Sequence, residues 1–104
     1  MKRVLINLLE NSIAVLSEGG IIEIIISCDQ EKDVVLLEVR DNGPGVSDED
    51  KHRLFEPYFS TKKSGTGLGL AIANTVVSDH GGQIRISDNI PTGAIFTVEL
   101  PLSS

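Results

Sequence analysis

Two Gly-Gly pairs constrain the fold of this chain most strongly, because each ends a stretch with helical periodicity. Residues 2–17 carry valine and leucine at the spacing of one helix face, and Gly19-Gly20 follows them. Residues 68–80 form the second long helical stretch, and Gly81-Gly82 follows it. We therefore expect two long helices, each of which gives way to extended chain after its glycine pair.

Two stretches of strand character follow each glycine pair, and the first two are rich in β-branched residues. The four expected strands are residues 21–28, 34–40, 83–87 and 94–100. A short helix is expected from Ser47, which precedes three acidic residues, to near Leu54, and residues 56–67 are expected to be irregular. This element order predicts an α/β fold, a two-layer sandwich in which a mixed sheet carries helices on one face.

The composition fits one globular domain over residues 1–104, since 40% of the residues are hydrophobic and 23% are charged. No apolar run approaches the length of a membrane span, and we expect no direct membrane contact. The net charge of −6 disfavours nonspecific binding to nucleic acid. The single cysteine, Cys28, cannot form an internal disulfide, which fits a reducing cytoplasm. The first helix begins without a capping residue before it, so we expect a domain truncated at its N-terminus.

Asn7 and Asn11 lie four residues apart, so both amides project from one face of the first helix. Amide oxygens are hard ligands, suited to a Mg²⁺ ion that also holds phosphate oxygens and waters. The alternative is an ordinary polar helix face. The pair alone leaves both interpretations open.

Residues 41–45 (DNGPG) follow the second expected strand and cannot continue it. Asp41, at the end of an apolar strand, can be partly buried and can accept a hydrogen bond from an exocyclic amine such as that of adenine. Gly43 and Gly45 would let the backbone approach a flat ring closely. The alternative is a strand-ending turn that needs glycine for positive φ.

Residues 65–70 (GTGLGL) place three alternating glycines directly before a helix. Backbone amides there and the helix N-terminus form an anion site of the kind that binds phosphate. The segment lacks the ending of a Walker loop, and no strand directly precedes it as in a dinucleotide fingerprint. The alternative is a flexible loop.

Residues 55–62 (FEPYFSTK) hold three of the four aromatic side chains of the chain. These aromatics can pin a segment to the core, and Thr61 and Lys62 supply donors suited to phosphates. A local basic cluster, which fits a small anion, comprises Lys51, Arg53, Lys62 and Lys63. The alternatives are a small satellite core and a solvated loop.

Taken in this order, the four segments resemble the boxes of the ATP-binding catalytic domain of sensor histidine kinases. Residues 7–11 (NLLEN) are similar to the N box of that family, 41–45 to its G1 box, 55–62 to its F box and 65–70 to its G2 box. The resemblance spans essentially the whole chain. Within that family, the chain is most similar to nitrogen-regulation-type sensor kinases. The resemblance implies the Bergerat fold, an α/β sandwich.

The resemblance implies that the chain binds ATP with Mg²⁺ and donates the γ-phosphoryl group to a histidine on a separate dimerisation domain. Asn11 would hold Mg²⁺, Asp41 would bind the adenine amine, and residues 47–66 would form a lid. The implied catalytic residues are Asn7, Asn11, Thr61 and Lys62, and the implied metal ligand is Asn11. The implied nucleotide-binding residues are Asn7, Asn11, Asp41, Gly43, Gly45, Val46, Thr61, Lys62, Gly65, Thr66, Gly67, Leu68, Gly69 and Leu70.

The implied partners are the histidine-bearing dimerisation domain of a homodimeric parent kinase and its response regulator. The implied location is cytoplasmic, with or without a membrane anchor in the parent. Neither His52 nor His80 lies in a segment that resembles a phosphoacceptor box. The chain departs from many relatives at Ala94, where they have threonine, and it lacks the strand that usually precedes the first helix.

Three other functions stay open. Gyrase-type and chaperone-type ATPases carry a glutamate at the position of Asn7, and an amide is a poor base, which disfavours hydrolysis of ATP. A serine kinase of the anti-sigma-factor type has a similar sandwich, although the F-box-like segment speaks against it. A non-catalytic nucleotide-binding or scaffolding module is the third, and the intact Asn11, Asp41 and glycine positions speak against it.

Overall fold

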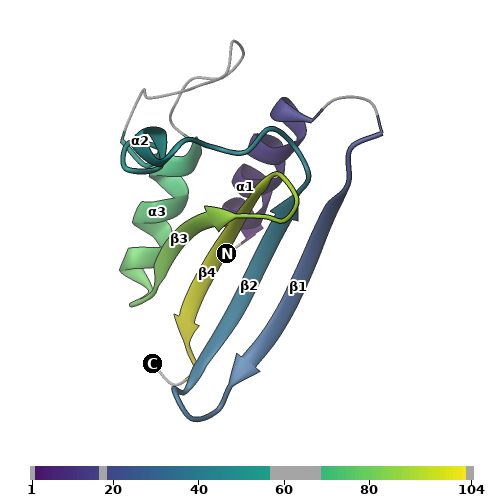
Figure 1. Ribbon diagram of the computed structural model, residues 1–104. Coiled ribbons are helices and arrows are strands. Elements are labelled where there is room, and N and C mark those ends of the chain that lie inside the picture. The colour runs from purple at the N-terminus through teal and green to yellow at the C-terminus, as the bar shows by residue number, and fades with distance from the viewer. Residues whose placement is uncertain (1, 17–18, 57–68, 103–104) are drawn as a thin grey trace.

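The computed structural model describes residues 2–16, 19–56 and 69–102 (Figure 1). Its elements are α1 (Lys2–Val15), β1 (Ile22–Asp29), β2 (Val34–Asp41), α2 (Asp48–Lys51), α3 (Gly69–Asp79), β3 (Gln83–Asp88) and β4 (Ala94–Pro101). The expected elements are all present, and the strand boundaries differ by one residue. The short helix is only one turn long. Ser47 is its N-cap, since the Ser47 hydroxyl accepts a hydrogen bond from the Asp50 N–H at 3.1 Å.

The strands form one sheet in the order β1-β2-β4-β3, and all three neighbouring pairs are antiparallel. The expectation of a mixed sheet is therefore wrong for the described residues, although the two-layer α/β sandwich is confirmed. Tight connections join β1 to β2 and β3 to β4, which makes those pairs antiparallel. The crossover through α3 gives β2 and β3 the same direction, but β4 lies between them, so no parallel pair forms.

The core lies between one face of the sheet and the two long helices, which Figure 1 shows side by side. Val39 of β2 and Phe96 of β4 occupy paired positions and are both 0% exposed. Burial of each such side chain contributes about 1.5–3 kcal/mol. The helices complete the core with Val4, Leu8, Leu70, Ala73 and Val77.

The opposite face of the sheet carries ion pairs beside apolar side chains such as Ile25 and Ile95. Arg40 Nη2 lies 2.7 Å from Glu38 Oε1, and Arg85 Nη1 lies 3.2 Å from Glu99 Oε1. The helices therefore cover one face, as expected. None of the helices in the described parts of the chain is long and apolar enough to cross a lipid bilayer.

The edge strand β1 stays exposed along most of its length. Ile24 and Ile26 pair with Val39 and Leu37 and share their face of the sheet, yet they are 46% and 70% exposed. The helices thus cover the β2 side of this face and leave the β1 side open. The contribution of β1 to stability should therefore come mainly from its backbone ladder.

Candidate functional site

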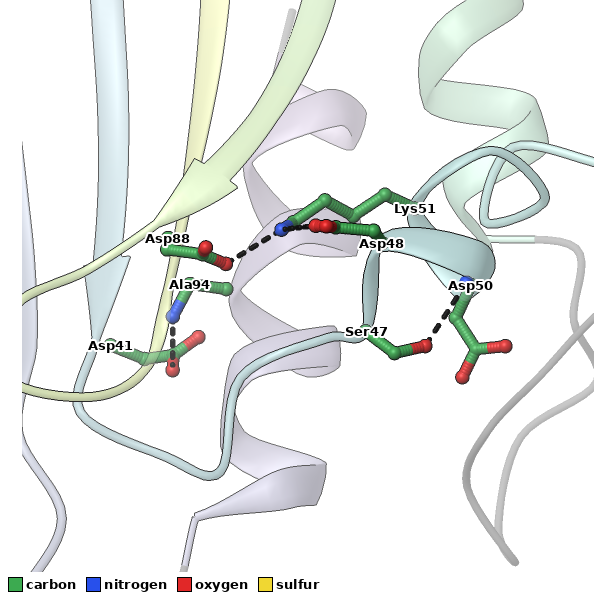
Figure 2. Close-up of polar contacts among 7 residues, drawn as sticks. All are labelled: Asp41, Ser47, Asp48, Asp50, Lys51, Asp88 and Ala94. Carbon is green, nitrogen blue, oxygen red and sulfur yellow. Dashed lines mark hydrogen bonds and ion pairs between the residues drawn. The ribbon is translucent and has the colours of Figure 1, made fainter.

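Asp41 is a buried carboxylate at the end of β2, 2% exposed. Its Oδ1 accepts hydrogen bonds from the Gly43 N–H at 3.0 Å and the Ala94 N–H at 3.2 Å, the latter drawn in Figure 2. Its Oδ2 accepts one from the Ser12 hydroxyl at 3.2 Å. The carboxylate is thus held by the turn that follows β2, by the start of β4 and by α1, which compensates for its burial.

The turn at residues 41–45 is braced by the loop that joins β3 to β4. Asn89 Nδ2 donates to the Asp41 carbonyl at 2.8 Å, and Thr92 Oγ1 donates to the Gly43 carbonyl at 2.9 Å. Gly93 has φ +116°, and a Cβ there would overlap the Asp41 carbonyl oxygen. The two loops therefore approach as closely as backbone atoms allow, which only glycine permits at this point.

Gly45 is the second glycine that this approach requires. Its φ is +79°, and a Cβ there would lie 3.2 Å from the Gly93 carbonyl oxygen. The turn therefore needs glycine for its conformation, as the alternative interpretation held, but the same turn also presents Asp41. Val46, directly after it, is partly buried against the core.

The predicted segments on α1 and α3 also meet. Asn7 Nδ2 donates to the Gly69 carbonyl at 3.0 Å, and Gly69 is the first residue of α3. Asn11 lies one turn further along α1 and is half-buried, next to the fully buried Ser12. One helix therefore contacts the start of α3 through Asn7 and the end of β2 through Ser12.

Other predicted residues lie outside this arrangement or outside the described residues. Leu70 is 8% exposed and belongs to the hydrophobic core, where it positions the first turn of α3. The expected lid falls half outside the described residues, because residues 57–66 lie there, while residues 47–56 form α2 and the turns around it. The predicted site residues that lie outside the described residues are Thr61, Lys62, Gly65, Thr66, Gly67 and Leu68.

Two residues of the basic cluster, Lys51 and Arg53, form ion pairs with carboxylates. Lys51 Nζ lies between Asp88 Oδ1 at 2.7 Å and Asp48 Oδ1 at 2.9 Å (Figure 2). The hydrogen bonds to Asp88 and Asp48 raise the pKa of Lys51, and the bond from Lys51 lowers the pKa of Asp48. Arg53 Nε lies 3.5 Å from Glu56 Oε1. Lys51 therefore links α2 to the end of β3, and its ammonium group is paired with carboxylates rather than available to bind a separate anion.

The sequence did not reveal Ser12, Asn89 or Thr92 as parts of the site. Each reaches Asp41 or Gly43 across 29 to 49 positions of the chain. A serine inside an apolar helix face was the one available signal, because such a hydroxyl needs a partner when buried. Within the described residues, no group of three His, Cys, Asp or Glu side chains could hold a metal ion.

A comparison of the sequence with models of known protein families finds a match. The family model of histidine kinase-, DNA gyrase B- and HSP90-like ATPases matches residues 1–104. Sporulation kinase E of Bacillus subtilis is 36% identical over 102 residues, which cover 98% of this chain and 14% of that kinase. The chain thus spans about a seventh of the length of this curated relative.

Solved structures of histidine kinases have a fold similar to that of this chain. The mycobacterial sensor histidine kinase MprB superimposes with a TM-score of 0.86 at 32% identity, over 95% of this chain and 70% of that one. The histidine kinase ThkA, in complex with the response regulator protein TrrA, gives a TM-score of 0.81 at 35% identity. That match covers 98% of this chain and 28% of ThkA.

Proposed function

This chain belongs to the family of histidine kinase-, DNA gyrase B- and HSP90-like ATPases, in which its relatives are sensor histidine kinases, and we propose that it is the ATP-binding catalytic module of a two-component sensor kinase. The observation that carries the proposal is the double contact of α1. Asn7 contacts the start of α3, and Ser12 contacts Asp41. A nucleotide along α1 would reach Asp41 with its base and the start of α3 with its phosphates.

At the base end, Asp41 would accept a hydrogen bond from the adenine amine. The carboxylate is buried, so this bond would form away from competing water and would discriminate strongly. Gly43, Gly45 and Val46 would line the base. Both glycines lack a side chain that would separate the backbone from a flat ring.

At the phosphate end, the N-terminus of α3 would favour the negative charge of the triphosphate. Gly69 and Leu70 begin this helix, and Gly65, Thr66, Gly67 and Leu68 directly precede it in sequence. Thr61 and Lys62 would donate to the phosphates from the lid. Six residues of this proposal lie outside the described part of the chain and are included because of the family resemblance alone: Thr61, Lys62, Gly65, Thr66, Gly67 and Leu68.

The half-buried amide of Asn11 fits Mg²⁺, because this ion accepts one or two protein oxygens together with substrate phosphates and waters. Bound Mg²⁺ would neutralise charge on the β- and γ-phosphates. Asn11 would therefore orient the ion rather than enclose it.

The γ-phosphoryl group would pass to a ring nitrogen of a histidine on a separate domain, with ADP as leaving group. Asn7 cannot act as a general base, and its Nδ2 is already bonded to Gly69. Attack by water is therefore not promoted. The proposed acceptor is a histidine outside residues 1–104, because neither His52, on the turn after α2, nor His80, at the end of α3, lies in a segment that resembles a phosphoacceptor box.

The first proposed partner is a histidine-bearing dimerisation domain in a homodimeric parent. The second is a response regulator, the kind of protein with which ThkA forms a complex. We propose a cytoplasmic location, and the exposed thiol of Cys28 fits a reducing compartment.

A transfer assay tests this function. The chain would be incubated with γ-labelled ATP, Mg²⁺ and a histidine-bearing dimerisation domain as an acceptor in trans, beside the same acceptor without its phosphoacceptor histidine. Label on the intact acceptor alone, in a linkage that acid cleaves and alkali does not, supports the proposal. Rapid release of inorganic phosphate without labelled acceptor would show a hydrolytic ATPase instead.

A further inference from the structure

Ser12 is fully buried on α1, and its hydroxyl donates to Asp41 Oδ2 at 3.2 Å. Serine inside a helix usually bonds to the carbonyl four residues back or points to solvent. Here the hydroxyl instead reaches a carboxylate 29 positions away. The described residues contain three buried polar side chains, and Ser12 and Asp41 are two of them.

The donors around Asp41 leave one acceptor position open. A carboxylate offers about four lone-pair positions, two on each oxygen. The Gly43 and Ala94 N–H groups occupy both positions on Oδ1, and Ser12 occupies one on Oδ2. The remaining position on Oδ2 can accept a hydrogen bond from one of the two N–H groups of an exocyclic amine.

Ser12 is the only side chain among the described residues that donates to this carboxylate. The two donors on Oδ1 are the backbone N–H groups of Gly43 and Ala94. The carboxylate is held on Oδ1 by two backbone donors, and on Oδ2 Ser12 is the one donor among the described residues. Removal of its hydroxyl would open a second position on Oδ2, which water or a differently placed ligand could occupy.

We propose that Ser12 is a positioning residue that occupies one acceptor position on Oδ2 of Asp41, directs a ligand amine to the other position, and thereby strengthens the preference of the site for a purine that carries an exocyclic amine. The inference rests on the proposed function, in which Asp41 binds the adenine base. It adds a residue on α1 to base selection, a role assigned so far only to β2 and the turn after it.

The test compares two nucleotides, ATP and purine riboside 5′-triphosphate, which lacks the 6-amino group. Calorimetric titration in the presence of Mg²⁺ gives the ratio of their dissociation constants for each variant. We expect the wild-type chain to prefer ATP by about tenfold, since hydrogen bonds to charged groups are the strong ones. Ser12→Ala should reduce the ratio to less than about threefold and leave the affinity for purine riboside triphosphate unchanged.

Two further variants separate positioning from packing. Ser12→Thr keeps the hydroxyl and should restore the preference for ATP. Ser78→Ala, at an exposed position of α3, is the matched control and should match the wild type. If Ser12→Ala does not fold, Ser12→Cys keeps a similar volume with a weak donor and should still lower the ratio.

Equal losses of affinity for both nucleotides in Ser12→Ala, or an unchanged ratio, would overturn the inference and leave the proposed function standing. A folded wild-type chain that binds neither nucleotide, or binds both equally, would overturn the role of Asp41 in adenine recognition and this inference with it. Binding of both nucleotides supports it if the ratio falls in Ser12→Ala, or in Ser12→Cys where Ser12→Ala does not fold, and is kept in Ser12→Thr and Ser78→Ala.

Discussion

The side-chain amide of Asn7 donates to the backbone carbonyl of Gly69 at 3.0 Å and so ties the middle of α1 to the first residue of α3. We predict that Asn7→Ala lowers the free energy of unfolding by about 1 kcal/mol, because the bond is lost at a half-buried position. Urea unfolding measures the change. Asn74→Ala on α3 is the control, since it makes the same change in helix propensity without removing this bond. Equal effects of both substitutions would contradict the prediction.

Gly93 allows the close approach of the loop before β4 to the Asp41 carbonyl. We predict that Gly93→Ala costs more than about 3 kcal/mol of unfolding free energy, because a positive φ and a backbone overlap act together. Gly19→Ala is the matched control. Its φ is +84° with nothing within 4 Å of the added Cβ, so only the conformational strain of about 1 kcal/mol should remain. Similar losses at both positions would show that the overlap relaxes freely.

The Lys51 ion pairs should stabilise the fold over a defined pH range. The pKa of Lys51 is raised by Asp88 and Asp48, so its contribution is full below the ordinary lysine value of 10.5 and is lost as the pH rises through the raised pKa. The pKa of Asp48 is lowered by Lys51, so its contribution is full above the ordinary value of 3.8 and is lost as the pH falls through the lowered one.

Lys51→Met removes both pairs while keeping much of the side-chain volume. We predict a stability difference from wild type that stays constant through the neutral range and shrinks at both extremes of pH. Urea unfolding at a series of pH values measures it. A difference that changes between pH values near 6 and near 8 would assign the effect to another group.

The order of the elements followed from local patterns, because helix periodicity and glycine pairs act over short distances. The pairing of the strands did not follow, since the insertion of β4 between β2 and β3 depends on contacts between residues far apart in the chain. A mixed sheet was expected from the same elements for that reason. The length of α2 was overestimated, because turns at residues 52–55 continue from Lys51 without forming a helix.

The site shows the same division. The burial of Asp41 at the end of a strand and the glycine-containing turn after it could be predicted from the sequence, since both are local features. The donors that hold Asp41 and its turn were not, because Ser12, Asn89 and Thr92 come from three other parts of the chain. The contact between Asn7 and Gly69 likewise joins residues 62 positions apart.

The core on the helix side should contribute far more to stability than the exposed isoleucines of β1. We predict that Leu8→Ala, at a fully buried position, costs about 2–5 kcal/mol. Ile26→Ala, at a position 70% exposed, should cost much less. Thermal and urea unfolding of both variants check this. A comparable loss at Ile26 would mean that another surface covers β1 in solution.

The most direct test of the central claim is calorimetric titration of the chain with a non-hydrolysable ATP analogue, with and without Mg²⁺, beside Asp41→Asn and the control Asp79→Asn. Asp79 is an exposed carboxylate at the end of α3, so its substitution should leave nucleotide binding intact. We predict Mg²⁺-dependent binding in the micromolar range that Asp41→Asn abolishes in a variant that stays folded. A folded wild-type chain that binds no nucleotide, or an Asp41→Asn variant that binds as tightly as wild type, would contradict the assignment of Asp41 as the adenine acceptor.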